Sequence, residues 1–221
     1  MQWTTPNILT ILRLIAALLV ALAFIVLPRP YADIAGLVLF SLAAMTDWLD
    51  GYLARSWKQG TKLGAMLDPI ADKAMVVLAL AALLSVSSLS SALLLPAALI
   101  LFREVFVSGL REFLGETARA LAVTRLAKWK TAVQMLAISL LMMHGIAEHY
   151  VGMGAWGMDE ATLIAVLNGE LPDEAGLRHF LSLMNGTGWA GMALLWSAAG
   201  LTLFTGVDYF LKALPHLREP G

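Results

Sequence analysis

Hydrophobic residues along this chain are gathered into six long runs, which are separated by shorter polar or turn-forming segments. The runs cover about 7–27, 34–54, 65–86, 92–110, 130–147 and 187–211, and proline, glycine or charged residues bound them. A helix of about 20 residues, rising 1.5 Å per residue, crosses a hydrocarbon core of about 30 Å. The pattern therefore predicts an all-α, polytopic membrane protein with six transmembrane helices in one domain, residues 1–221.

A longer polar insertion, at about 149–185, lies between the fifth and sixth runs. Within it, residues 159–167 and 173–183 each start with aspartate, a residue favoured at helix N-caps, and continue with helical patterning. We expect two short amphipathic helices there, forming a peripheral cap on the bundle.

The composition supports a membrane protein and excludes several other classes. Hydrophobic residues make up 59% of the chain and charged residues only 14%, about half the usual charged fraction of a soluble domain. The net charge of -1 leaves no basic excess for nucleic acid, and the absence of cysteine excludes disulfides and thiolate metal sites. His144, His149, His179 and His216 lack the spacing of a metal site, so we expect them at the surface.

The distribution of lysine and arginine predicts the orientation, because cytoplasmic loops of membrane proteins retain positive charge. The loops on one side hold only Arg29 and Arg178. Those on the other side, with the C-terminal tail, hold ten: Arg55, Lys58, Lys62, Arg111, Arg119, Arg125, Lys128, Lys130, Lys212 and Arg218. We therefore expect both termini and the connection between the second and third helices in the cytoplasm.

Four aspartates lie inside the ends of the second and third predicted helices, where a charge costs about 2.5–3.5 kcal/mol at the bilayer centre. Asp47 and Asp50 are three residues apart and Asp68 and Asp72 are four apart, so each pair shares one face of its helix. A short hairpin makes the two helices antiparallel neighbours. We expect the four carboxylates to converge near the cytoplasmic surface.

This carboxylate cluster needs positive charge, and the neighbouring sequence supplies only Arg55 and Lys73. We therefore expect divalent cations, with two as the expected number. Carboxylate oxygens suit Mg²⁺ or Mn²⁺, and Mg²⁺ completes its coordination with water and substrate phosphates, which implies a phosphorylated substrate. Gly51 and Gly64 lie beside the aspartates, although glycine costs about 1 kcal/mol relative to alanine inside a helix. They admit either a ligand or a closely packed helix.

The spacing of these residues, DxxDGxxAR followed by eight residues and GxxxDxxxD, resembles the full signature of the CDP-alcohol phosphotransferases. This resemblance implies six membrane helices with the active site near the cytoplasmic face. It also implies transfer of a phosphatidyl group from a CDP-linked lipid to an alcohol, with release of CMP. By motif position, Asp47, Asp50 and Asp68 would bind metal, and Asp72 would belong to the metal centre and act as general base.

The same resemblance supplies candidate contacts to the nucleotide. Gly51, Arg55 and Thr61 would contact the diphosphate or the ribose of the CDP-lipid, and Gly64 belongs to the same set. The opening PNILT also resembles the start of the first helix in the family, which adds Asn7 and Thr10. Pro6 and Asn7 could equally serve only to begin a helix.

The acceptor alcohol is predicted from a second group of charges. Arg103 and Arg111 lie in the fourth helix and Lys130 at the start of the fifth, and together they could bind a phosphate by charge-assisted hydrogen bonds. The alternative is internal pairing of Arg103 with Glu104 or Glu112. These stretches, within a likeness that spans roughly residues 1–141, resemble family members that join sn-glycerol 3-phosphate to CDP-diacylglycerol.

The resemblance further implies a bacterial inner membrane protein, surrounded by membrane lipids, that forms a homodimer. A family member with another acceptor, inositol phosphate or serine, is the nearest alternative function. A cation or proton transporter is disfavoured, because the four acids lie near one membrane surface and the second half of the chain has no counterpart to them.

Overall fold

The computed structural model describes residues 4–57, 61–115 and 125–217, and for residues 6, 47–57 and 125–128 it describes only the backbone. These ranges are almost entirely helical, as predicted. The helices are α1 (Thr5–Val26), α2 (Tyr31–Trp57), α3 (Lys62–Val86), α4 (Ser90–Leu114), α6 (Arg125–Gly154), α7 (Glu160–Asn168) and α8 (Leu177–Leu217).

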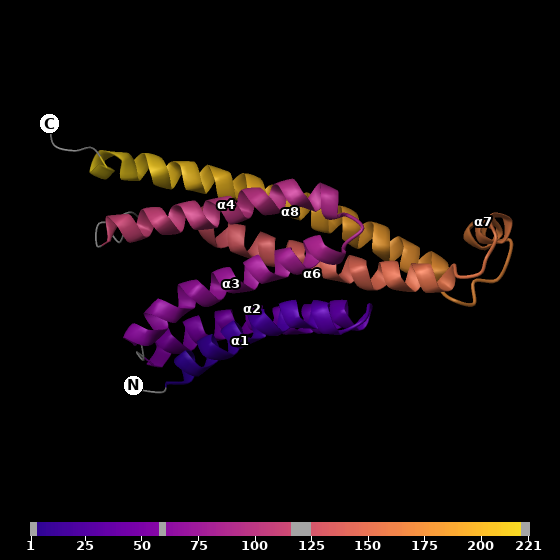
Figure 1. The fold of residues 1–221 in the computed structure, drawn as a ribbon, viewed down its shortest axis with the longest axis horizontal. Helices are drawn as coiled ribbons and strands as arrows, with labels where there is room; N and C mark the ends of the chain where they lie inside the picture. Colours follow the sequence, from indigo (N-terminus) through magenta and orange to yellow (C-terminus); the bar gives the residue numbers. More distant parts are fainter. Residues whose placement is uncertain (1–3, 58–60, 116–124, 218–221) are drawn as a thin grey trace.

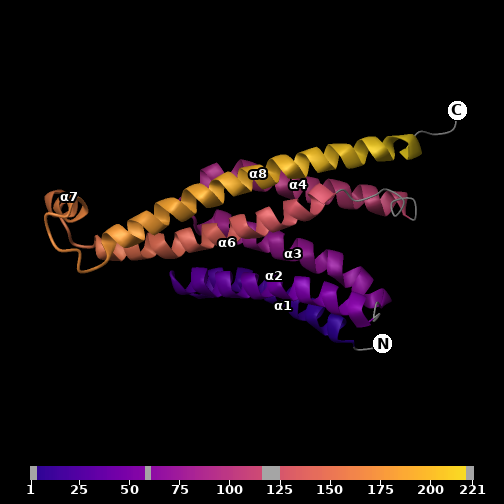
Figure 2. The ribbon, with the colours of Figure 1, turned by 180° about the vertical axis from the view of Figure 1, so that it is seen from behind.

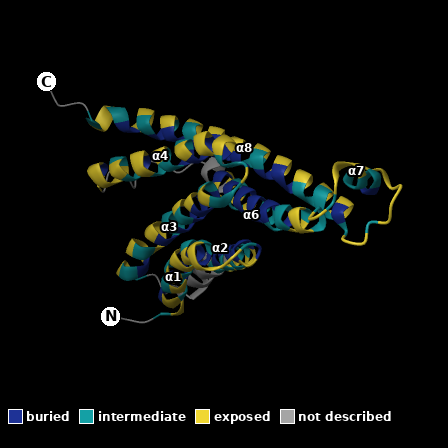
Figure 3. Ribbon diagram, turned by 45° about the vertical axis from the view of Figure 1, so that its right-hand side comes forward, coloured by how far each residue is buried: buried dark blue, intermediate teal, exposed yellow. Residues whose placement is uncertain are grey.

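Each hydrophobic run of the sequence lies in one long helix. Over the described residues, five of these helices are long and apolar enough to cross a membrane, and the apolar part of α2, Tyr31–Thr46, is a shorter sixth stretch. Large apolar side chains such as Leu18 and Phe102 are mostly exposed, as expected of a surface that faces lipid. Figure 3 shows exposed residues along the outer faces of the bundle. The predicted all-α, multi-pass architecture is confirmed.

The long helices pack in two groups. In one group α1 packs along α2 and α3, and in the other α8 packs along α4 and α6. Figures 1 and 2 show α3 and α6 between the pair α1 and α2 and the pair α4 and α8. A shared core joins the groups through fully buried side chains that include Phe40, Met75, Ile100, Ile138 and Leu195. The first turn of α1 and the last turn of α8 lie at the same end of the bundle (Figure 1).

The polar insertion differs in part from the prediction. The first expected helix, 159–167, is confirmed as α7, where the Asp159 side chain accepts a hydrogen bond of 2.8 Å from the amide of Thr162. The second, 173–183, is wrong as a separate helix, because the chain is continuously helical from Leu177 to Leu217. Asp173 instead caps α8, since its carboxylate accepts from the amides of Leu177 and Arg178 at 2.7 and 2.9 Å.

Both caps lie in the part of the protein that extends beyond the other long helices. At 1.5 Å per residue the 41 residues of α8 span about 60 Å, roughly twice a hydrocarbon core. Figure 1 shows the first part of α8 and the last part of α6 reaching past the other long helices toward α7.

Hydrogen bonding to Thr162 lowers the pKa of Asp159, and hydrogen bonding to Arg178 lowers the pKa of Asp173, so both caps stay ionised at neutral pH.

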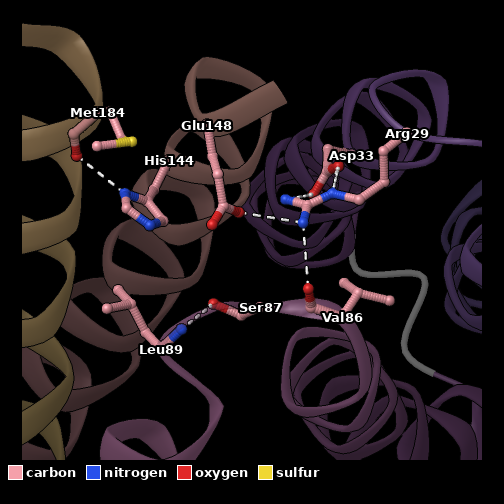
Figure 4. Close-up of polar contacts among 8 residues, drawn as sticks. All are labelled: Arg29, Asp33, Val86, Ser87, Leu89, His144, Glu148 and Met184. Carbon is pink, nitrogen blue, oxygen red and sulfur yellow. Dashed lines mark hydrogen bonds and ion pairs between the residues drawn. The ribbon is translucent and has the colours of Figure 1, made fainter. Parts of the chain in front are cut away.

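A cluster of three charged residues, Arg29, Asp33 and Glu148, joins the helices at the end of the bundle opposite the termini. The Arg29 guanidinium donates to Asp33 at 2.7 Å, to Glu148 at 3.1 Å and to the carbonyl oxygen of Val86 at 3.1 Å. Figure 4 shows this arginine, which lies in the turn before α2, reaching toward Glu148 of α6 and Val86 at the end of α3. Because Asp33 is fully buried, its charge depends on this partner. The cluster therefore ties the α1–α2 turn to two other helices.

Gly145 makes the approach of this cluster to α6 possible. A Cβ atom at Gly145 would lie 2.3 Å from both Arg29 Nη2 and Asp33 Oδ1. We expect Gly145→Ala to destabilise the protein by about 1–3 kcal/mol through overpacking. The midpoint of thermal unfolding in detergent, followed by circular dichroism, measures this. Gly152→Ala on the same helix is the control, because open space surrounds that position, and it should not lower the midpoint.

Candidate active site

The four aspartates of the motif lie on α2 and α3, which pack against each other as predicted. The backbone of α2 carries Asp47, Asp50, Gly51 and Arg55, but the side chains of these residues lie outside the described part of the chain. The convergence of all four carboxylates therefore stays a prediction.

The two aspartates of α3 are held by polar side chains of α1. Thr10 Oγ1 donates a hydrogen bond of 2.6 Å to Asp68 Oδ1, and Arg13 Nη1 forms a 2.5 Å ion pair with Asp72 Oδ1. The Arg13 side chain is 1% exposed, whereas that of Asp72 is 46% exposed. The donor of this charge-assisted bond is therefore buried between α1 and α3, whereas the Asp72 carboxylate that accepts it remains accessible to solvent.

Asn7 extends the same face of α1, three residues before Thr10, and meets the start of α3. Thr61 is the N-cap of α3, and its hydroxyl accepts from the amide of Gly64 at 3.0 Å and donates to Asn7 Oδ1 at 2.7 Å. A Cβ at Gly64 would lie 2.8 Å from Asn7 Oδ1. The absence of a side chain at Gly64 therefore lets α1 and α3 approach closely, which supports the packing explanation for this glycine.

Sequence reasoning missed Arg13. A signal was present, because Arg13 is the one charged residue in the first hydrophobic run, 7–27. A buried cation inside a membrane needs a partner, and an acidic partner on a neighbouring helix was available. The pairing with Asp72 depends on which face of α1 meets α3, and the packed structure decides that.

A cavity of about 350 Å³ opens beside Asp68 and Asp72, within the usual range of small-molecule sites. The walls come from α3, α4 and α6. The polar lining residues are Asp68, Asp72, Lys73, Arg103, Glu104, Ser108, Arg111, Lys130, Thr131 and Gln134. The structure thus brings the three predicted acceptor-binding cations to the same cavity as two of the four predicted metal-binding aspartates.

Glu104 partly neutralises the cations on the α4 and α6 wall. Its carboxylate pairs with Lys130 and with Arg103, the latter at 3.3 Å. The internal Arg103–Glu104 pair considered as an alternative is therefore present. However, three cations face one carboxylate on this wall, because Arg111 instead lies 5.2 Å from the ring centroid of Tyr209. The wall keeps a net positive charge that suits an anion.

Helix α8 contacts two of these cations, Arg103 and Arg111, and holds them in position. Sequence reasoning did not assign this role to α8. Arg103 Nη2 donates to Thr205 Oγ1 at 3.3 Å, and a Cβ at Gly206 would lie 3.0 Å from Arg103 Cγ. Tyr209 contacts Arg111. The four-residue spacing of Thr205 and Tyr209 places them on one face, but nothing in the sequence says that this face meets α4.

Comparison with known proteins identifies the family of this chain. The profile of the CDP-alcohol phosphatidyltransferase family matches residues 3–167, and the chain belongs to this family. These are membrane-embedded phosphotransferases, which is the class that the helical bundle and its charged cavity indicate.

Among its relatives are bacterial proteins named CDP-diacylglycerol--glycerol-3-phosphate 3-phosphatidyltransferase. The protein from Cereibacter sphaeroides is 55% identical over 222 residues, 99% of each chain. That from Pseudomonas fluorescens is 36% identical over 98% of this chain and 93% of its own. That from Escherichia coli is 40% identical over 64% of this chain and 78% of its own. The likeness is therefore not confined to residues 1–141, because the first two alignments also include the polar insertion.

Proposed function

We propose that this protein transfers the phosphatidyl group of CDP-diacylglycerol to sn-glycerol 3-phosphate, giving phosphatidylglycerophosphate and CMP. Family membership and the named relatives support the reaction. The observation that carries the acceptor assignment is the cavity itself, which holds Asp72 on one wall and Arg103, Arg111 and Lys130 on the other. A small alcohol that bears a phosphate can contact both walls at once, whereas an acceptor without a phosphate leaves the cations unmatched.

In this mechanism the α4 and α6 wall binds the acceptor phosphate. Arg111 supplies a guanidinium that no described carboxylate pairs with, and Arg103 and Lys130 exchange part of their contact with Glu104 for phosphate oxygens. The acceptor hydroxyl then points toward α3, where Asp72 removes its proton as the hydroxyl attacks the phosphorus of the CDP-lipid. Arg13 fixes the orientation of the Asp72 carboxylate.

The acidic residues of the motif fit divalent cations. Asp47, Asp50, Asp68 and Asp72 supply hard carboxylate oxygens, and the Thr10 hydroxyl orients Asp68 while that residue stays exposed. Two ions of Mg²⁺ or Mn²⁺ would neutralise the diphosphate and stabilise the charge at the attacked phosphorus.

We propose that the CDP-lipid is bound by a second set of residues: Asn7, Thr10, Gly51, Arg55, Thr61 and Gly64. Of these, Asn7 and Thr10 are each 1% exposed and act by bracing Thr61 and Asp68.

We place the cavity and both termini on the cytoplasmic side of a bacterial inner membrane, where soluble glycerol 3-phosphate is available. Ten lysines and arginines in the sequence support this orientation, as does the position of the first turn of α1 and the last turn of α8 at one end of the bundle (Figure 1). The homodimer remains a prediction from the family. Family membership argues against the transporter alternative.

A panel of acceptors tests the reaction. Purified protein with labelled CDP-diacylglycerol should use glycerol 3-phosphate at least about tenfold faster than serine, inositol or inositol phosphate, because only the first combines a small alcohol with a phosphate. Product analysis by chromatography measures each rate. A tenfold preference for any other acceptor would contradict the acceptor assignment and leave the family chemistry intact.

Asp72→Asn tests the general base. The amide keeps an oxygen that can accept from Arg13 but cannot take up the proton, so turnover should fall by about 10² or more while binding of metal and CDP-lipid is largely retained. Turnover with saturating substrates and binding of CDP-diacylglycerol are measured separately. Near-normal turnover would remove this role from Asp72.

Thr10→Val tests whether Asp68 is a metal ligand that α1 orients. The substitution keeps the size of the side chain and removes the hydroxyl, so the Mg²⁺ concentration needed for half-maximal activity should rise by about tenfold. Thr10→Ser is the matched control, because it keeps the donor and should stay close to the parent protein. An unchanged Mg²⁺ requirement in Thr10→Val would argue against the role.

A further inference from the structure

His144 lies on α6 near the end of the bundle opposite the charged cavity, and it is 7% exposed, in contrast to the surface position expected from the sequence. Its Nδ1 atom lies 2.9 Å from the carbonyl oxygen of Met184 on α8. Because a carbonyl oxygen can only accept a hydrogen bond, Nδ1 must carry the hydrogen. In the neutral ring Nε2 is then an acceptor with a lone pair to satisfy.

Nε2 is buried and has no hydrogen-bond partner among the described residues. Figure 4 shows this nitrogen turned away from Met184 and toward the turn that carries Ser87 and Leu89. A Cβ at Gly188 would lie 2.8 Å from Nδ1, so the ring packs directly against the backbone of α8 and cannot turn freely. A buried acceptor held in this way costs free energy until a donor reaches it.

The ring borders a cavity of about 390 Å³ between α4, α6 and α8. Besides His144 and Asn185, its main lining residues are apolar: Leu89, Ala92, Met184, Trp189 and Met192. None of the lining residues is charged. A solvated ion therefore gains little there, whereas an amphiphile can place its apolar part against the lining and its polar part at Nε2.

The cavity lies in the half of the bundle farther from the charged cavity, which the proposed orientation places in the outer leaflet. His144 follows Lys130 by 14 residues along α6, about 21 Å of helix, which places it toward the far boundary of a hydrocarbon core of about 30 Å. Trp189 at the cavity is 80% exposed, as is usual for tryptophan at a membrane interface. A lipid of the surrounding bilayer can therefore reach the cavity sideways.

We propose that this cavity binds a membrane lipid whose headgroup carries an uncharged hydroxyl, which donates a hydrogen bond to His144 Nε2 while the chain lies against α4 and α8. A fully ionised phosphate or carboxylate has no hydrogen to give and finds no cation in the lining. An ammonium group would lack a carboxylate, because Glu148, one turn along α6, is paired with Arg29 at 3.1 Å. This site is separate from the proposed catalytic cavity and does not depend on the proposed reaction.

Two probes that share one chain test the proposal in detergent-solubilised full-length protein. 1-Mono(9,10-dibromostearoyl)glycerol carries hydroxyls, methyl 9,10-dibromostearate carries none, and the bromines of both quench tryptophan on contact. Subtracting the quenching measured in Trp189→Phe isolates the signal of Trp189. We expect saturable quenching by the monoacylglycerol at a concentration roughly fivefold lower than for the ester, a difference typical of one hydrogen bond.

His144→Phe removes the acceptor and keeps an aromatic ring, so the two probes should then quench alike. His179→Phe, a substitution of an exposed histidine that does not line this cavity, should keep the difference. An unchanged gel-filtration profile and an unchanged midpoint of thermal unfolding establish that each variant is folded. Equal quenching by both probes in the parent protein, or a preference that survives in His144→Phe, would overturn the proposal.

Filling the cavity is a second test, which does not require that His144→Phe folds. Ala92→Phe adds a ring from α4 while His144 stays in place, and it should abolish the Trp189 quenching by the monoacylglycerol. Undiminished quenching in a folded Ala92→Phe protein would show that the lipid binds elsewhere.

Discussion

The polar contact between α1 and α3 is the interaction on which the candidate active site depends. A membrane interior supplies no water to satisfy a buried cation or hydroxyl, so these groups must find partners within the protein. Arg13 and Thr10 find them in Asp72 and Asp68, at 2.5 and 2.6 Å. The same bonds that satisfy α1 therefore fix two of the motif aspartates at the edge of the cavity, so that stability and chemistry share one set of contacts.

The opposite wall is built differently, because its cations outnumber its carboxylates. Lys130 and Arg103 share Glu104, while Arg111 is held by the ring of Tyr209. A carboxylate and an aromatic face hold the cations in place without cancelling their charge. Carboxylates of α3 and cations of α4 and α6 thus line one cavity, and under the proposed function one small phosphorylated alcohol contacts both.

The two ends of the bundle have different roles. Charged groups line the cavity near the termini, whereas at the other end the Arg29 cluster joins three segments and the cavity beside His144 has a mostly apolar lining. The long pair α6 and α8 connects these ends, because α8 supplies Thr205 near the first cavity and Met184 at the second. Glycines at 145, 188 and 206 each allow a side chain of another element to lie directly against a helix backbone.

Hydropathy and local spacing were enough to locate the long helices, α7 with its Asp159 cap, and the motif aspartates, because each of these depends on residues close together in the chain. The same reasoning failed at 173–183, where a capping aspartate suggested a short helix. That segment continues into α8, which is helical without interruption over Leu177–Leu217 although Asn185 and Gly186, a turn-forming pair, precede the hydrophobic run. A cap marks where a helix starts but carries no information about its length.

The sequence by itself determined that this chain crosses a membrane repeatedly and carries the spaced aspartates of a family signature, because apolar length and fixed spacing are local properties. Only the tertiary structure decided that Arg13 pairs with Asp72, that Thr205 and Tyr209 support the arginines of α4, and that His144 is buried. Each of these depends on the rotation of one helix against another, and that rotation is set by the packing of many distant side chains together.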